Sequence, residues 1–229
     1  MQKFAGGDKS WVGKFTYSGC ACLTCKGSVG LATERPGYQL VGMNLTLQLR
    51  EGLPEDMQTL LRDYPREAWP ENPHFARSVQ NWMGAHQMFR RLAGITRADT
   101  EAYLDNTASS GAFASRVSYY GDLLVRNLHG HHSWEDHAFF PEMRRADGRF
   151  EQGLETLEAD HVQLDETLDR FTRAANRAIK LIQLDEKQVR GEVGELHGCA
   201  QDIEGFLARH LPDEEELVVP IILHHKLRG

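Results

Sequence analysis

Apolar side chains recur every three or four positions along four long segments of the chain. A spacing of this kind places them on one face of a helix. These positions are Phe75, Val79, Trp82, Phe89 and Ala93; Val117, Tyr120, Leu124 and Leu128; Leu154, Leu157, Leu164, Leu168, Phe171, Ala175 and Ala178; and Leu196, Cys199, Ile203, Phe206, Leu217 and Ile221. Four apolar faces of comparable length predict an all-α protein, an antiparallel four-helix bundle over residues 73–227.

Small, capping and helix-breaking residues predict where these helices begin and end. Gly94 is expected to end the first helix, with a short extra helix at residues 100–104 in the link that follows. Small and hydroxyl residues at 107–111 would begin the second helix. The turn into the third lies at residues 146–148, and Asp185 would cap the fourth.

The N-terminal part of the chain has a different composition. Residues 1–42 hold eight of the 21 glycines and three of the four cysteines, and they show no regular period. We expect them to be an irregular leader, with Met43 as the natural start. Residues 43–72, which contain several prolines, are expected to form a lead-in arm with one short helix at 55–63.

Composition narrows the class of protein. With 41% hydrophobic residues and a formal net charge of −7, the chain is expected to fold and not to use nucleic acid as its main partner, because phosphate contacts need a basic face. The apolar run at 217–223 is far short of a bilayer span, and no secretory signal is apparent. We therefore expect a cytoplasmic protein that does not bind membranes.

Each of the four apolar faces also contains one histidine. They are His86, His131, His161 and His210. A buried polar group costs roughly 2–7 kcal/mol when it finds no partner. Glu135 and Glu214 follow two of these histidines by four residues, which puts each pair on one helix face. A divalent cation would satisfy both the imidazoles and the carboxylates, so the pattern predicts a metal site.

Two segments repeat the same motif. Residues 131–141 read HHSWEDHAFFP and residues 210–220 read HLPDEEELVVP, both H-x3-E-x5-P. The pattern resembles the hemerythrin-like, or HHE cation-binding, family over about residues 75–225. The resemblance implies a four-helix bundle around two non-haem iron ions, with Mn or Zn as substitutes. It also implies that the four histidines are terminal iron ligands and that Glu135 and Glu214 bridge the ions.

Several further ligands stay open. Oxygen-carrying hemerythrins have a second histidine on the third helix, where this chain has Asp165. Glu215 is an alternative bridge. His132 and Asp136 would replace His131 and Glu135 if the register shifted by one residue, but the apolar face favours His131 and Glu135. Whether His132 also ligates stays open. Pro212 makes the geometry of the second pair the less certain of the two.

The cysteines at positions 20, 22 and 25 do not match a known metal-binding motif. A structural zinc site takes four ligands, and only three thiolates are local. Their role, whether zinc binding or redox sensing, stays open.

Imidazole and carboxylate ligands suit iron, manganese or zinc, and the resemblance to the hemerythrin-like family implies two iron ions. We therefore expect a non-haem di-iron protein that binds or senses O2, NO, peroxide or iron, with a small diatomic molecule as partner. Iron-centre repair or iron donation, and a di-iron oxidase or peroxidase, are the alternatives. A ferritin-like enzyme would need two ExxH pairs, and only Glu158 and His161 form one. No catalytic residue, protein partner or oligomeric state is predicted.

Overall fold

The computed structural model of the protein describes residues 47 and 50–228. Residues 1–42, Met43 and the cysteines at positions 20, 22 and 25 lie outside this part. The long helices are α1 (Arg77–Leu104), α5 (Glu151–Leu184) and α6 (Glu186–His225). A fourth helical rod is continuous from Ser110 to Ala146 and consists of α2 (Ser110–Arg116), η3 (Val117–Gly121), α3 (Asp122–Trp134), η4 (Glu135–Phe139) and α4 (Phe140–Ala146).

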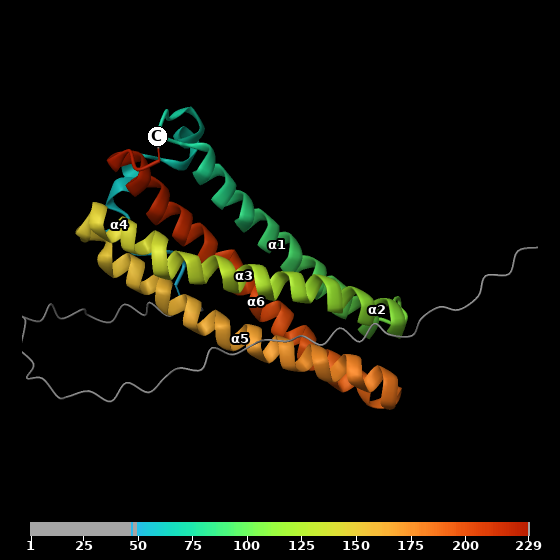
Figure 1. Ribbon diagram of the computed structural model, residues 1–229. Coiled ribbons are helices and arrows are strands. Elements are labelled where there is room, and N and C mark those ends of the chain that lie inside the picture. Colours follow the sequence, from blue (N-terminus) through green and yellow to red (C-terminus); the bar gives the residue numbers. More distant parts are fainter. Residues whose placement is uncertain (1–46, 48–49, 229) are drawn as a thin grey trace, which may run out of the picture.

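The four rods lie side by side along a common long direction, which confirms the all-α bundle (Figure 1). Helix α6 packs along both α5 and α1, while α3 contacts α1 and α5. The C-terminus lies at the end of the bundle where α1 begins and α4 ends (Figure 1). This arrangement brings one face of each rod to the centre of the molecule.

Three of the predicted helix starts are confirmed by capping contacts. Ser109, Asp147 and Asp185 precede α2, η5 (Gly148–Phe150) and α6. The side chain of each accepts a hydrogen bond from a backbone N–H of the first turn, at 3.1 to 3.3 Å. These groups have no partner inside the helix, so each cap stabilises the start of its element.

The predicted end of the first helix at Gly94 is wrong. Helix α1 continues to Leu104, and the separate helix expected at 100–104 is its last turn. The residues beyond Gly94 still face the bundle, since Thr96 and Thr100 are fully buried. Their burial outweighs the penalty of about 1 kcal/mol for glycine inside a helix.

The arm also differs from its predicted form. Instead of one helix at 55–63 it has two 3₁₀ segments, η1 (Thr59–Arg62) and η2 (Arg66–Glu71). Pro65 precedes η2 and Pro70 lies inside it, and neither can donate the hydrogen bonds of a longer α-helix. Five buried apolar side chains anchor the arm to the bundle. They are Leu53, Met57, Leu60 and Trp69 in one apolar cluster and Leu47 in the other.

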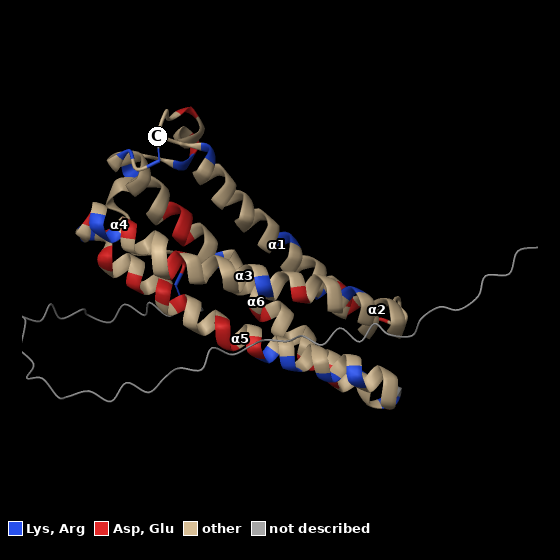
Figure 2. Cartoon of the chain, in the orientation of Figure 1, with Lys and Arg blue, Asp and Glu red and all other residues tan. Residues whose placement is uncertain are grey.

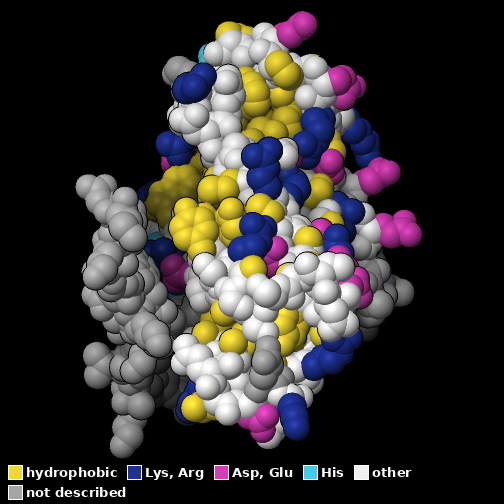
Figure 3. All heavy atoms as spheres, turned by 90° about the vertical axis from the view of Figure 1, so that its right-hand side faces the viewer, with side chains coloured by type: hydrophobic (Ala, Val, Ile, Leu, Met, Phe, Trp, Pro, Cys, Tyr) yellow, Lys and Arg dark blue, Asp and Glu magenta, His cyan; other side chains and the backbone are white. Residues whose placement is uncertain are grey.

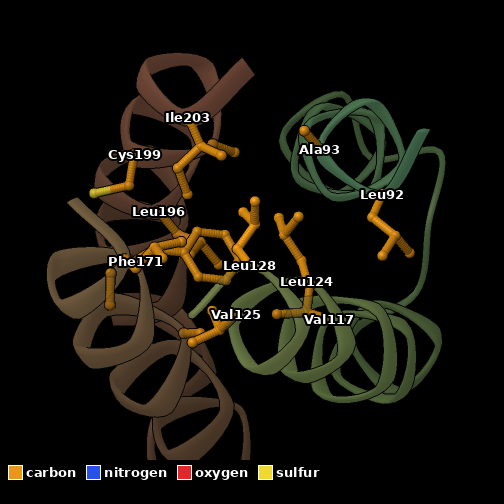
Figure 4. Packing of buried hydrophobic residues seen from close by; sticks show 14 of the residues in the cluster. Leu92, Ala93, Val117, Leu124, Val125, Leu128, Phe171, Leu196, Cys199 and Ile203 are labelled. Carbon is orange, nitrogen blue, oxygen red and sulfur yellow. The ribbon is translucent and has the colours of Figure 1, made fainter. Parts of the chain in front are cut away.

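Buried apolar side chains form two clusters rather than one continuous core. In the first cluster Leu124 and Leu128 meet Phe171 and Leu196 between the helices (Figure 4). The second surrounds the other end of the bundle and includes Phe140, Met143, Leu154, Leu217 and Ile221. Between the two clusters lies a layer of buried polar side chains. On α5, for example, His161 separates Leu157 of the second cluster from Leu164 of the first.

Charged residues are distributed unevenly between interior and surface. A run of acidic residues at 213–216 lies within α6, partway along the bundle (Figure 2). On the face in Figure 3, acidic and basic side chains are interspersed, with hydrophobic side chains between them. Within the described part of the chain, no helix has the length and hydrophobicity to cross a lipid bilayer.

Replacement of Gly94 by alanine tests the continuity of α1. A Cβ at Gly94 would lie 3.6 Å from Glu204 Oε1, an ordinary contact. Gly94→Ala is therefore expected to raise the free energy of unfolding by about 0.5–1 kcal/mol, measured by urea denaturation. At Gly153 the added Cβ would lie 2.9 Å from Leu217 Cδ2, so Gly153→Ala should lower it. A loss of stability in Gly94→Ala would contradict the continuous helix.

Candidate metal centre

Seven side chains gather in the polar layer between the two apolar clusters. They form two groups, and within each group the potential ligand atoms lie within 4.8 Å of one another. One group is His86, His131, Glu135 and Glu214, and the other is His132, His161 and His210. The structure thus brings together all six residues singled out in the sequence, and it adds His132.

Each rod of the bundle contributes to this centre. His86 comes from α1, His161 from α5, and His210 and Glu214 from α6. The remaining three residues lie where α3 gives way to η4. The side chain of His131 is 9% exposed, and the other six residues are buried almost completely. Apolar packing on both sides of the layer fixes the height of each helix and with it the position of each side chain.

His131 and His132 point to opposite neighbours of the same helix. They are about 100° apart around the axis. His131 faces α1, where its Nε2 lies 3.0 Å from that of His86. His132 faces α5 and stacks on the His161 ring, with ring centroids 4.1 Å apart. Both are inward because α3 lies between two helices of the bundle, so the structure places His132, whose role the sequence left open, beside the other histidines of the centre.

The helix widens at the point where Glu135 enters the site. Residues 135–139 of η4 form a π-helical turn, a feature that is frequent at functional sites. Glu135 Oε1 accepts a hydrogen bond of 2.6 Å from Trp82 Nε1 and lies 2.8 Å from His131 Nε2. Pro141, which has no N–H to donate, follows just after this turn.

Both glutamates lie between the two groups of histidines. Glu135 contacts His131 at 2.8 Å through Oε1 and approaches His161 Nε2 to 3.9 Å through Oε2. Glu214 Oε2 lies 3.5 Å from His86 Nε2 and 3.8 Å from His210 Nε2. Each carboxylate therefore reaches a histidine of either group, as a bridging ligand must. Pro212 does not prevent His210 and Glu214 from facing the same site.

Three of the histidines donate Nδ1–H to a carboxylate outside the two groups. The pairs are His86 with Glu215 at 2.9 Å, His161 with Asp136 at 2.7 Å, and His210 with Asp160 at 3.1 Å. Such partners orient a ligating imidazole and leave its Nε2 lone pair free. Because Nδ1 carries the proton in both His161 and His210, their Nε2 atoms, 3.1 Å apart, present two lone pairs to each other. A cation beside them would turn this repulsion into coordination.

Several buried atoms of the centre have no hydrogen-bond partner among the described residues. Both ring nitrogens of His132, both carboxylate oxygens of Glu214 and Oε2 of Glu135 are of this kind. Each unpaired polar atom inside a protein is unfavourable, so their concentration in one layer calls for a common partner. The donors present, five imidazoles and two carboxylates, fit a divalent metal such as Fe, Mn or Zn.

Burial dominates the electrostatics of the centre. It lowers the pKa of His210 to about 4, although the hydrogen bond to Asp160 acts in the opposite direction. It also lowers the pKa of His86 and, together with the neighbouring histidines, places that of His132 well below its ordinary value. His86, His132 and His210 therefore favour the neutral form, which is the form that binds metal.

The two glutamates respond to burial in opposite ways. For Glu135, burial is outweighed by the hydrogen bond from His131 and by the nearby imidazoles, which bring its pKa to about 2. For Glu214, burial and the negative charge of Glu135 raise the pKa well above its ordinary value. In the metal-free protein the surroundings thus favour the ionised form of Glu135 and disfavour that of Glu214. A bound cation would allow both to ionise.

The open alternatives at Glu215 and Asp165 have different outcomes. The carboxylate of Glu215 contacts His86 and two arginines, Arg66 at 2.7 Å and Arg90 at 3.4 Å, so it supports a ligand instead of bridging. Asp165 is 48% exposed, lies 3.4 Å from His129 Nδ1, and belongs to neither group.

A network of charged side chains lies beside His210. Asp160, which accepts from His210, also forms a buried ion pair with Arg50 of the arm. The same guanidinium contacts Asp213 at 2.8 Å through Nε, and Asp213 is paired with Arg209 as well.

Sequence reasoning named Glu215 and Asp136 only as alternative ligands, and it missed Asp160 and Arg50. Asp136, Asp160 and Glu215 each adjoin a residue of the centre in the sequence, which is a signal that could have revealed them. Trp82 was recognised only as an apolar position. Arg50 gave no signal, because it lies far from the motifs and outside the helices.

Replacement of His132 tests whether it belongs to the centre. His132→Ala is expected to reduce bound metal and the melting temperature together, because a ligand is lost and metal binding stabilises the fold. The loss of affinity should exceed the roughly 10–100-fold typical of an outer partner. The exposed His137 on the same rod provides the control, and His137→Ala should keep its metal. Elemental analysis and thermal melting measure both effects, and a wild-type metal content in His132→Ala would exclude this role.

The pKa shifts predict that the metal-free protein loses stability as the pH falls from 6.5 to 4.5. In this window the unfolded chain protonates His86, His132 and His210, whereas the folded chain resists protonation. Glu214 acts in the opposite direction, since its raised pKa stabilises the fold at the acidic end. Three shifts against one leave a net uptake of up to about two protons on unfolding, or up to about 3 kcal/mol per pH unit. Urea denaturation of chelator-treated protein at pH 7, 6 and 5 measures this, and equal stability at all three values would contradict it.

Comparison with known proteins identifies the family. A family model described as Hemerythrin HHE cation binding domain matches residues 77–222. No curated protein and no solved structure shows significant similarity to the chain. The matched segment begins with α1 and ends within α6, so it contains the whole centre but not the arm. Because the match covers well over half of the sequence, the chain belongs to the hemerythrin HHE cation-binding domain family.

Proposed function

We propose that the protein holds two non-haem iron ions in the polar layer of its bundle and binds or senses a small molecule there, such as O2, NO or peroxide. The observation that carries this proposal is that two groups of metal-ligating side chains lie next to each other, and that Glu135 and Glu214 each approach a histidine of both groups. Membership of the family supports cation binding, and the presence of two donor groups supports two ions.

The division of donors supports one ion in each group. His132, His161 and His210 would hold one ion. His86 and His131 would hold the other. Glu135 and Glu214 would bridge them, because each already approaches a histidine of both groups. Two cations would also offset the burial and mutual repulsion that raise the pKa of Glu214 beside Glu135.

The donors leave room for an additional ligand. Five imidazole nitrogens and four carboxylate oxygens make nine donor atoms, whereas two octahedral ions have twelve positions. Iron at this centre would supply redox chemistry and open positions for a small molecule. The buried setting favours a ligand of a few atoms, since only His131 is appreciably exposed.

The chain itself contributes orientation and exclusion of water. Asp136, Asp160 and Glu215 fix the tautomers of three ligands, and Trp82 holds Glu135 by its indole N–H. The apolar clusters on either side of the layer keep bulk water away. Binding or sensing is favoured over iron donation because the proposed ligands are enclosed within the bundle.

The elemental content of the full-length protein tests the proposal. Protein purified from iron-supplemented cells is expected to carry about two iron ions per chain, and His210→Ala should carry fewer. On exposure of the reduced protein to O2 or NO, the visible absorption spectrum should change. The exposed-site variant His137→Ala serves as the control and should behave like the wild type. A folded wild-type protein without bound metal would overturn the proposed function.

A further inference from the structure

Arg50 is a buried cation in an unexpected place. It belongs to the arm, before the first helix and outside the residues that match the family. Its side chain is nevertheless only 3% exposed. A buried charge is unfavourable unless oppositely charged groups surround it, and here Asp160 of α5 and Asp213 of α6 do so.

The contacts of Arg50 lead directly to one histidine of the centre. Its Nη1 and Nη2 atoms form a two-pronged interaction with the carboxylate of Asp160, and Nη1 lies 3.0 Å from Oδ1. The same carboxylate accepts Nδ1–H of His210 at 3.1 Å. Through Nε the guanidinium also holds Asp213, which lies three residues after His210 on the same helix. Arg50 thus restrains His210 in two ways: through Asp160, the hydrogen-bond partner of the imidazole, and through Asp213 on α6, the helix that contains His210.

The bidentate contact of Arg50 with Asp160 lies beside the three-histidine group of the centre. Asp160 adjoins His161, which belongs with His210 to the three-histidine group. The other group depends on Glu215, whose arginine partners are Arg66 and Arg90. The two groups are therefore supported by separate sets of arginines.

We propose that Arg50 is a positioning residue for His210, and that the arm thereby controls how firmly the three-histidine group retains its metal ion. The proposal rests on the proposed function, because it concerns an ion bound by that group. With Arg50 in place, Asp160 is held in one orientation and His210 directs Nε2 at the ion. Without it, Asp160 loses its arginine partner, and the imidazole loses the constraint on its orientation.

Metal release from site variants tests this role. The wild type, Arg50→Met and Arg50→Lys are loaded with Fe²⁺, and the loss of iron to an excess of chelator is followed with time. Arg50→Met is expected to release one of its two ions about 10–100-fold faster than the wild type, and the second at the wild-type rate. Arg50→Lys keeps a charge but cannot engage both carboxylates in this geometry, so its first ion should leave at an intermediate rate.

The control is Arg62→Met. Arg62 is also in the arm, but its side chain is 72% exposed and pairs only with Glu55 among the contacts that the structure gives it. Its removal should leave both release rates unchanged. Absorption spectra of the Co²⁺-loaded variants add a second readout, because a change at one ion alters only part of the ligand-field bands.

The possible outcomes separate the two proposals. Equal release rates in Arg50→Met and the wild type would overturn the role of Arg50 alone. Faster release of both ions to the same extent would also overturn it, since a general loosening of the fold acts on both groups. If Arg50→Met does not fold, Arg50→Lys decides by the same criterion. A wild type that binds no iron would overturn the proposed function itself.

Discussion

The structure depends on a layer of polar atoms that the fold removes from water. Imidazole nitrogens and carboxylate oxygens at this level have few donors to pair with, and two Nε2 lone pairs face each other at 3.1 Å. Desolvation makes such atoms unfavourable, and only a positive charge among them reverses the sign of the interaction. The lengths of the helices, the packing above and below, and the outer carboxylates all serve to hold this layer in place.

The positive charges of the surrounding arginines are part of the same balance. Carboxylates that orient the ligands would repel one another if they stood alone in the interior. Arg50, Arg66 and Arg90 pair with two of these carboxylates, Asp160 and Glu215, and offset that repulsion. Such an arrangement separates two tasks, since the inner donors remain available while the outer charges are already paired.

How much the sequence could predict depended on the kind of signal. A histidine in an apolar stripe, such as His86 or His161, is visible because it breaks a regular pattern. The role of His132 stayed open because the rotation of a helix about its axis is set by its neighbours, and the periodicity of its own segment does not reveal it. The continuation of α1 through Gly94 has a similar cause, since tertiary packing outweighed local propensity. Arg50 could not be found because its partners are 110 and 163 residues away.

The polar layer also divides the hydrophobic interior into two halves. Each half buries its own apolar cluster, and the side chains that join them are those of the centre. A protein whose core is interrupted in this way can open in parts, because each half is close to a separate cooperative unit. Metal ions bound to side chains from all four rods would link the two halves into one cooperative unit. Occupancy of the centre would then be felt at both ends of the bundle as a change in how readily its backbone amides exchange with solvent.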